Sequence, residues 1–184
     1  MEPAVTDFAG DVQNDHPSID KESVRKNKFR LKSRDFQLRV KVFQARQLDG
    51  SNLYPVCRVR VVGHTRQTKI CKGTNEPQFN EVFFFNFNMH EAEMYDEIIE
   101  FEVCNSRALR ADVIIGTFKV DLGFIYAQVK HSIIRKWLLL ANDDDRTASA
   151  KGYLKVSINI LGSGDEAPVS KIQMKFCLLE LRLY

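Results

Sequence analysis

The stretch FQLRVKVF, residues 36–43, alternates between apolar and charged side chains. In an extended chain its leucine and its two inner valines share one face, and Arg39 and Lys41 share the other. The same period of two returns near the end of the sequence in GYLKVSINIL, residues 152–161. Because this period is typical of a strand with one buried face, both stretches are predicted to be β-strands that contribute to a core.

Further apolar runs lie between these two stretches, separated by Gly, Pro, Asn and Asp residues that favour turns. They are VCRVRVV (56–62), RQTKIC (66–71), NEVFFFNF (80–87), IIEFEVC (98–104), IIGTFKVD (114–121) and KWLLL (136–140). The FFFNF segment is predicted to be a strand buried on both faces. Only residues 90–97 and 122–134 look helical. The sequence therefore predicts an all-β fold, an eight-stranded antiparallel β-sandwich.

The two ends of the chain differ from this pattern. Residues 1–28 are mostly polar with no apolar period, so we expect a disordered N-terminal segment. The folded domain is expected over residues 29–163. Residues 164–184 begin like a linker and end as the apolar run FCLLELRLY, which is predicted to be a loosely anchored tail.

The composition is that of a globular protein, with a net charge of +3, so any basic function must come from local clustering. The four cysteines show no C-x-x-C spacing and are expected to be reduced. The N-terminus has no apolar signal-peptide core, and no run approaches the roughly 18 apolar residues of a membrane span. We therefore expect a cytoplasmic protein.

Several sequence motifs follow one another along the chain in a characteristic order. PQFNEVFFF (77–85) and IIG (114–116) together resemble the landmarks of a C2 domain, and the resemblance spans about residues 36–162. NSRALRADVIIGTFKVDLGFIY (105–126), RKWLLL (135–140) and SAKGYLKVSINILGSGDE (149–166) resemble the second C2 module of the ferlin family.

The resemblance implies a circularly permuted (type II) C2 topology, in which both termini leave from the end opposite the calcium loops. The connections 48–54, 72–78, 105–112 and 141–151 would then share one end. Ferlins act in membrane fusion, vesicle trafficking and membrane repair, and they carry several C2 modules and a membrane anchor. A single module without an anchor is expected to be a truncated chain.

The resemblance also tells where calcium ligands would lie. Calcium prefers several carboxylate oxygens, but Tyr54, Arg107 and Val113 occupy positions where the family pattern has aspartates. Asp49 and Asn105 are the weak residual candidates, together with Asp112, which is one residue out of register. The acidic run 142–147 is expected to be a solvated turn. We therefore expect no metal site and no cofactor.

Basic residues offer an alternative binding surface. On residues 56–62, Arg58 and Arg60 share a face, and a hairpin about Gly63 would add cations from the next run. The predicted basic face consists of Arg39, Lys41, Arg58, Arg60, Arg66, Lys69 and Lys72. The resemblance implies that such a face binds phosphoinositides, other anionic phospholipids or an acidic partner, as it does in many C2 domains.

Two functions remain open at this stage. One is a non-enzymatic, calcium-independent module that docks on anionic phospholipid membranes. The other is a protein-interaction or structural module, with membrane-trafficking proteins as partners. Catalysis is not expected, because the histidines are scattered and neither a nucleophile motif nor a phosphate loop is present. The aromatic run is not expected to bind nucleic acid.

Overall fold

The computed structural model describes residues 33–142 and 149–165 of the 184-residue chain. The predictions made for residues 1–28 and for the tail beyond Asp165 lie outside the described residues. The strands are β1 (Arg34–Arg46), β2 (Pro55–Val61), β3 (His64–Gln67), β4 (Gln78–Met89), β5 (Ile98–Asn105), β6 (Val113–Asp121), β7 (Ser132–Leu140) and β8 (Gly152–Gly162). The helices are α2 (Glu91–Asp96), α3 (Leu122–Tyr126) and the 3-10 turn η1 (Val129–His131).

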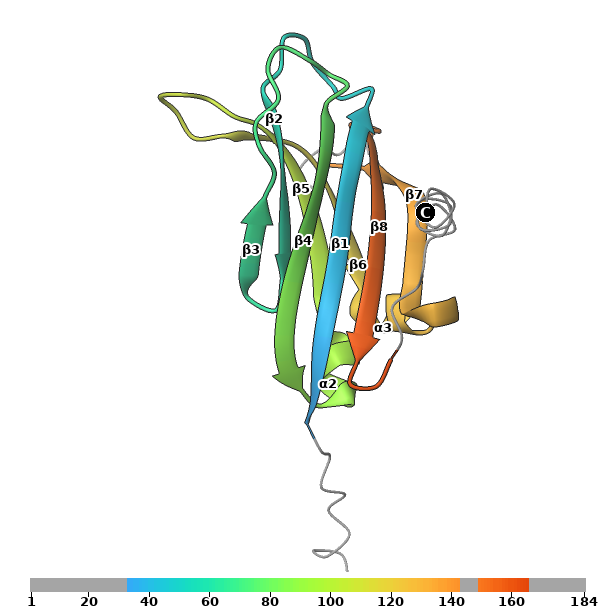
Figure 1. Cartoon of the computed structure of the whole chain (residues 1–184). Coiled ribbons are helices and arrows are strands. Elements are labelled where there is room, and N and C mark those ends of the chain that lie inside the picture. The colour runs from blue at the N-terminus through green and yellow to red at the C-terminus, as the bar shows by residue number, and fades with distance from the viewer. Residues whose placement is uncertain (1–32, 143–148, 166–184) are drawn as a thin grey trace, which may run out of the picture. The chain divides into compact units, whose positions relative to one another are not determined.

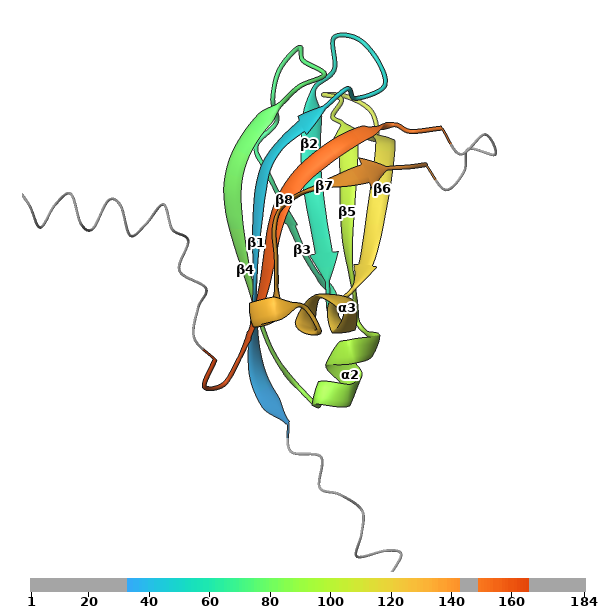
Figure 2. The same cartoon turned by 90° about the vertical axis from the view of Figure 1, so that its right-hand side faces the viewer.

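The eight strands form two antiparallel sheets. Sheet A has the order β4-β1-β8-β7, and sheet B has the order β3-β2-β5-β6. In Figure 1 the strands of sheet A lie in front, and Figure 2 shows the two layers from the side. This arrangement confirms the prediction of an eight-stranded antiparallel β-sandwich.

The direction of the strands decides which loops meet. The β1–β2, β3–β4 and β5–β6 connections and the ends of the β7–β8 connection all lie at the upper end of the sandwich, which we call the loop end (Figure 1). Phe36 at the start of β1 pairs with Gly162 at the end of β8. The first and the last strand therefore leave from the opposite end, as the type II topology requires.

The core lies between the sheets and follows from the alternation in sequence. On β1, Leu38, Val40 and Val42 are fully buried, and on β8 the inward side chains from Leu154 to Ile160 are equally buried. Sheet B contributes Phe101 from β5 and its neighbours. The two strands that alternate most clearly in the sequence are thus adjacent in the centre of sheet A.

Three local predictions are wrong. The FFFNF segment is not buried on both faces, because β4 belongs to a two-layer sandwich in which each sheet has one face towards the core and one towards solvent: Phe85 is buried, whereas Phe84 is 53% exposed. The strand predicted at 66–71 is β3 at His64–Gln67, and the following residues keep only isolated bonds to β2, such as Thr68 N–H to Cys57 O.

The third error concerns the helix predicted at 122–134. It ends at Tyr126, and β7 begins at Ser132. Lys130 and His131 both have positive φ angles, which interrupt any helix, and Ser132 then pairs with Asn159 of β8. Strand pairing therefore overrides the local helical spacing.

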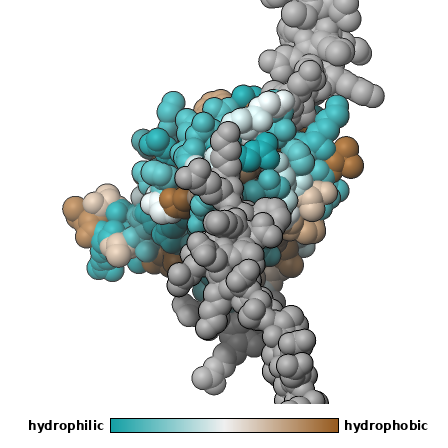
Figure 3. All heavy atoms as spheres, turned by 90° about the horizontal axis from the view of Figure 1, so that it is seen from below, coloured by the Kyte–Doolittle hydropathy of each residue, from teal (hydrophilic) through white to brown (hydrophobic). Residues whose placement is uncertain are grey.

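The lower end of the sandwich is closed by α2 and α3, which bury Met94, Leu122 and Ile125. Seen from below, the described residues at this end are mostly hydrophilic, with separate hydrophobic patches towards the margins (Figure 3). None of the helices in residues 33–142 and 149–165 is long and apolar enough to span a bilayer.

Candidate functional site

The loop end brings together the residues predicted as remnants of a calcium site. Asp49 follows β1, Tyr54 precedes β2, Asn105 ends β5, and Val113 begins β6. A pocket of about 250 Å³ lies beside Asp49, Asn105 and Val113, and it is lined also by Leu53, Ile114, Ile115, Asn142 and Lys151. The sequence thus located the loop end correctly, and the question is what its side chains can bind.

The first carboxylate of the loop end is already paired. The Lys151 ammonium lies 3.1 Å from Asp49 Oδ2, and the Asp49 N–H donates to the Lys151 carbonyl at 3.1 Å. The side-chain oxygen of Asn105 accepts a hydrogen bond of 2.8 Å from the Tyr54 N–H. A lysine ammonium therefore lies where calcium would need to meet Asp49.

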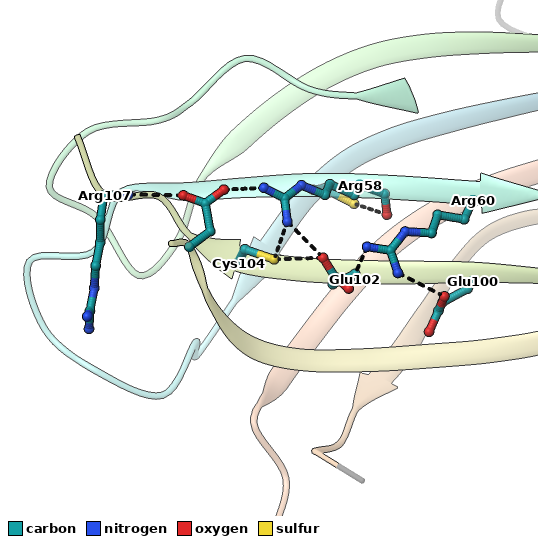
Figure 4. A network of polar contacts seen from close by, with 8 residues as sticks. Arg58, Arg60, Glu100, Glu102, Cys104 and Arg107 are labelled. Atoms are coloured by element: carbon teal, nitrogen blue, oxygen red, sulfur yellow. Dashed lines mark hydrogen bonds and ion pairs between the residues drawn. The ribbon is translucent and has the colours of Figure 1, made fainter. Parts of the chain in front are cut away.

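The second carboxylate, Asp112, is held in the same way. Its Oδ1 accepts a hydrogen bond of 3.1 Å from the Arg107 N–H, and its Oδ2 is paired with the Arg58 guanidinium. The pKa of Asp112 lies below its ordinary value despite partial burial. The main cause is the hydrogen bond from the Arg107 N–H, and the positive charge of Arg58 lowers the pKa further. The side chain of Arg107 itself extends away from this network (Figure 4).

These residues do not fit calcium. A calcium ion takes six to eight oxygens, with carboxylates prominent among them, whereas Val113 and its neighbours on β6 are apolar. Within residues 33–142 and 149–165, no three or more His, Cys, Asp or Glu side chains gather as a metal site would require. Of the acidic run predicted as a turn at 142–147, only Asn142 belongs to the described residues.

The predicted basic face is not one face. Arg39 and Lys41 lie on β1 in sheet A, whereas Arg58 and Arg60 lie on β2 in sheet B. Their outward side chains therefore point to opposite sides of the sandwich. The sequence placed these arginines and lysines correctly on solvent-facing positions, but it did not reveal that the loop after β1 crosses to the other layer.

The rest of the predicted set is also divided. Arg66 pairs with Val59 in the β2–β3 hairpin, so it lies on the side of sheet B opposite to Arg58. Lys69 and Lys72 are exposed in the connection after β3. Arg66 therefore does not extend the surface that carries Arg58, and Lys69 and Lys72 lie outside the strands of sheet B.

Arg58 and Arg60 are moreover neutralised by glutamates of β5. Glu102 accepts from Arg58 at 3.0 Å and from Arg60 at 3.0 Å, and Glu100 pairs with Arg60 at 3.4 Å (Figure 4). The register explains this, since Arg58 stands opposite Glu102 and Arg60 opposite Glu100. Neither glutamate is among the residues predicted from sequence. The matching R-x-R and E-x-E spacings were the available signal.

Glu102 is almost fully buried, and its charge depends on its partners. Burial alone would raise the pKa of this carboxyl, but the hydrogen bonds from Cys104 and Arg58 and the charges of Arg60 and Arg58 bring the pKa below its ordinary value. The Cys104 thiol donates to Glu102 at 3.0 Å, and burial followed by this contact raises the pKa of Cys104 to about 12. The pair therefore holds one negative charge, on Glu102.

This pairing predicts acid sensitivity. A carboxyl whose pKa is lowered on folding adds stability above its unfolded pKa, and that stability is lost as the pH falls through the folded pKa. We expect the free energy of unfolding to decrease below about pH 4.3, the ordinary value for Glu. Urea unfolding at several pH values should show a shallower acid decline for Glu102→Gln than for the parent. Equal declines would show that Glu102 does not carry the effect.

The outer face of sheet A presents a different charge pattern. The four strands of sheet A contain two carboxylates. Asp35 lies at the lower end, and Glu81 stands opposite the buried Val42, so its position in the register is directed to the inner side of the sheet. Cations of this face lie over aromatic rings instead of carboxylates. They are Arg39 over Phe84, Lys41 and Arg135 over Phe43, and Arg46 and Lys155 over Trp137. We call these five cations and three rings the cation–aromatic face.

Comparison with known proteins agrees with this fold. The C2 domain profile matches residues 36–140, and the profile of the FerI (NUC094) domain matches residues 141–175. A C2 domain of a plant extended synaptotagmin 1 superposes with a TM-score of 0.52 at 16% identity, covering 73% of this chain and 96% of that one. The calcium-bound pair of C2 domains of extended synaptotagmin 2 gives 0.56 at 23% identity, covering 72% and 44%. These likenesses concern the fold alone.

Sequence relatives narrow the class further. Myoferlin of Homo sapiens is 50% identical over 137 residues, or 74% of this chain, and myoferlin of Xenopus tropicalis is 49% identical over 140 residues, or 76% of this chain. The chain spans 7% of the length of each of these relatives. It belongs to the ferlin family and contains a ferlin C2 domain followed by the FerI segment. Strand β8, which lies within the FerI match, completes sheet A.

Proposed function

We propose that this chain is a non-enzymatic ferlin C2 module that docks on membranes rich in anionic phospholipids or phosphoinositides, without calcium. Its setting would be that of the family, in membrane fusion, vesicle trafficking and membrane repair. The observation that carries the proposal is the surplus of cations on sheet A. Among the described residues, none of the five cations of the cation–aromatic face pairs with a carboxylate.

The calcium-free part of the proposal has separate support. Asp49 and Asp112, the two carboxylates that could have served calcium, are paired with Lys151 and Arg58. Binding calcium would require both ion pairs to be broken and further oxygen ligands to be supplied. The charges of Asp49 and Asp112 are thus already balanced by side chains of the protein itself.

The expected strength is modest. Each Lys or Arg near an anionic membrane surface contributes about 1 kcal/mol, so five contribute about 5 kcal/mol, which is weaker than micromolar binding. Such binding becomes effective when a module is tethered to others, because tethering raises its effective concentration. It should also weaken with salt, because the Debye length is about 8 Å at physiological ionic strength and shorter above it.

The proposal is tested by vesicle sedimentation in EDTA. The chain should sediment with phosphatidylcholine vesicles that contain phosphatidylserine or a phosphoinositide, and it should stay in solution with pure phosphatidylcholine. Raising the salt concentration should release it. If the chain sediments equally with neutral and anionic vesicles, or with neither, the proposed function is wrong and the protein-interaction alternative is favoured.

A further inference from the structure

Two β-bulges meet on the outer face of sheet A. In β1 the register shifts between Val42 and Gln44, which leaves Phe43 without a partner on β8. In β7 it shifts between Ile133 and Lys136, which leaves Ile134 and Arg135 unpaired. The β7 bulge lies beside Ser157 of β8, whose hydroxyl accepts from the Arg135 N–H at 2.8 Å, and the β1 bulge lies beside the next residues of β8, Val156 and Lys155.

The bulges aim side chains that regular strands would direct elsewhere. Arg135 has a φ of 53°, a left-handed conformation that is uncommon outside glycine. From this position its guanidinium reaches across β8 to lie 5.4 Å from the Phe43 ring, and the Lys41 ammonium lies 4.9 Å from the same ring. Bulges often serve to re-aim a side chain. Here they collect two cations on one aromatic ring from strands that are not neighbours.

A second cluster lies nearer the loop end. Trp137 of β7 stands opposite Lys155 of β8, and the Arg46 guanidinium reaches it from β1. The distances to the ring are 5.1 Å from Arg46 and 5.3 Å from Lys155. Because β7 and β1 flank β8 in the sheet, the two clusters form one continuous surface over three strands.

Exposed apolar side chains border this surface on both edge strands. Val82 and Phe84 on β4 are 46% and 53% exposed, and Trp137 and Leu139 on β7 are 38% and 48% exposed. Lys41, Arg46 and Lys155 lie between them on the central strands. The face therefore combines central cations with apolar and aromatic margins.

This combination fits the interface of a bilayer. Lys and Arg side chains gain from the phosphates of anionic lipids, while Trp and similar rings prefer a position with one apolar and one hydrated side. Sheet B lacks the pattern, because Arg58 and Arg60 are committed to Glu100 and Glu102. An acidic protein would satisfy the charges, whereas a bilayer interface accommodates both the cations and the exposed rings without a partner of matching shape.

We infer that the cation–aromatic face of sheet A is the surface that meets an anionic phospholipid bilayer, with Trp137 in the lipid headgroup region. This inference rests on the proposed function and adds the docking face to it. The loop end, where C2 domains carry their calcium sites, is then not the contact surface.

The single tryptophan makes the inference measurable in the full chain. In EDTA, vesicles of phosphatidylcholine and phosphatidylserine in equal parts should shift the Trp137 emission to shorter wavelength. Brominated lipids in the same vesicles should quench it, and neutral vesicles should change neither signal. Unchanged emission from chain that sediments with the anionic vesicles would overturn the inference while leaving the proposed function intact.

Charge-reversal variants test whether vesicle binding depends on the cations of the cation–aromatic face or on exposed cations elsewhere. Since each basic residue at an anionic surface contributes about fivefold to binding, Lys41→Glu with Arg46→Glu should weaken sedimentation at least about tenfold. Arg66→Glu with Lys72→Glu makes the same change in net charge on exposed residues outside the cation–aromatic face, and it should bind within about threefold of the parent. Lys41→Gln with Arg46→Gln repeats the test without added repulsion, and thermal unfolding checks that each variant is folded.

The outcomes distinguish the inference about the docking face from the proposed function. Equal loss in both glutamate variants would make binding a net-charge effect and overturn the inference. Failure of the parent to bind anionic vesicles would overturn the proposed function itself. Binding of soluble poly-glutamate in that case would point to an acidic protein as the partner of this face.

Discussion

Replacing Arg58 and Arg60 together by glutamate is expected to unfold the domain or bring it close to unfolding. Glu102 is 3% exposed and would lose both of its cationic partners, with two further carboxylates placed beside it. Removing one partner of a buried ion pair costs about 3–5 kcal/mol, and whole domains are stable by about 5–15 kcal/mol. The midpoint of urea unfolding should therefore fall sharply.

The matched control is the reversal of two cations on the other sheet. Lys41→Glu with Arg46→Glu makes the same change in net charge, but neither residue has a carboxylate partner among the described residues. Its cost should be no more than about 1 kcal/mol for each substitution. Similar unfolding midpoints for the two double variants would show that the Arg–Glu network on sheet B does not stabilise the fold. The sequence alone predicts a different result, since it treats all of these residues as one solvated basic face.

Phe85→Ala is expected to destabilise the domain by about 3–5 kcal/mol, as truncation of a buried phenylalanine usually does. Phe85 is 3% exposed and packs in the core opposite Leu38 on β1. The neighbouring Phe84→Ala should cost about 1 kcal/mol or less, because Phe84 is 53% exposed and loses mainly its contact with Arg39. Urea unfolding of the two variants in parallel measures the difference.

This comparison tests the orientation of β4 directly. If both substitutions cost several kcal/mol, the strand is covered on its outer face as well, as the apolar run in the sequence suggested. If both cost little, Phe85 does not lie in the core. Only the alternating arrangement predicts a large effect at one position and a small effect at the next.

The sequence predicts the fold well where alternation is regular. The buried positions of β1 and β8 follow directly from their period of two, and the loop end follows from the up-and-down order of the strands. The run at 80–87 is ambiguous because three consecutive phenylalanines are compatible with a strand covered on one face or on both faces. Whether the outer face is covered depends on the layers that the rest of the chain forms, which the local pattern does not contain.

The site is harder to predict than the fold, for two physical reasons. Alternation tells which side chains face solvent, but it does not tell which layer a strand joins, so the sequence wrongly predicts Arg39 and Arg58 as neighbours. Their neutralisation also depends on pairing partners: Arg58 meets Glu102 only through the β2–β5 register. The cluster around Phe43 depends in addition on two bulges that have no signature in the sequence.

Sequence and structure both describe the positions at which the family pattern has calcium-binding aspartates. The resemblance located the missing carboxylates at Tyr54, Arg107 and Val113. The structure adds that Asp49 and Asp112 are held by Lys151 and Arg58. A metal ion could reach either carboxylate only after these ion pairs were broken, which is the physical basis of the proposal that the module docks without calcium.

The most direct test of calcium-independent docking is one binding isotherm measured twice. The fraction of chain that sediments with phosphatidylserine-containing vesicles is recorded against lipid concentration, once in EDTA and once in millimolar calcium. We predict coincident curves with the same half-saturating lipid concentration. Binding that appears only with calcium, or that strengthens at least tenfold with it, would contradict the account.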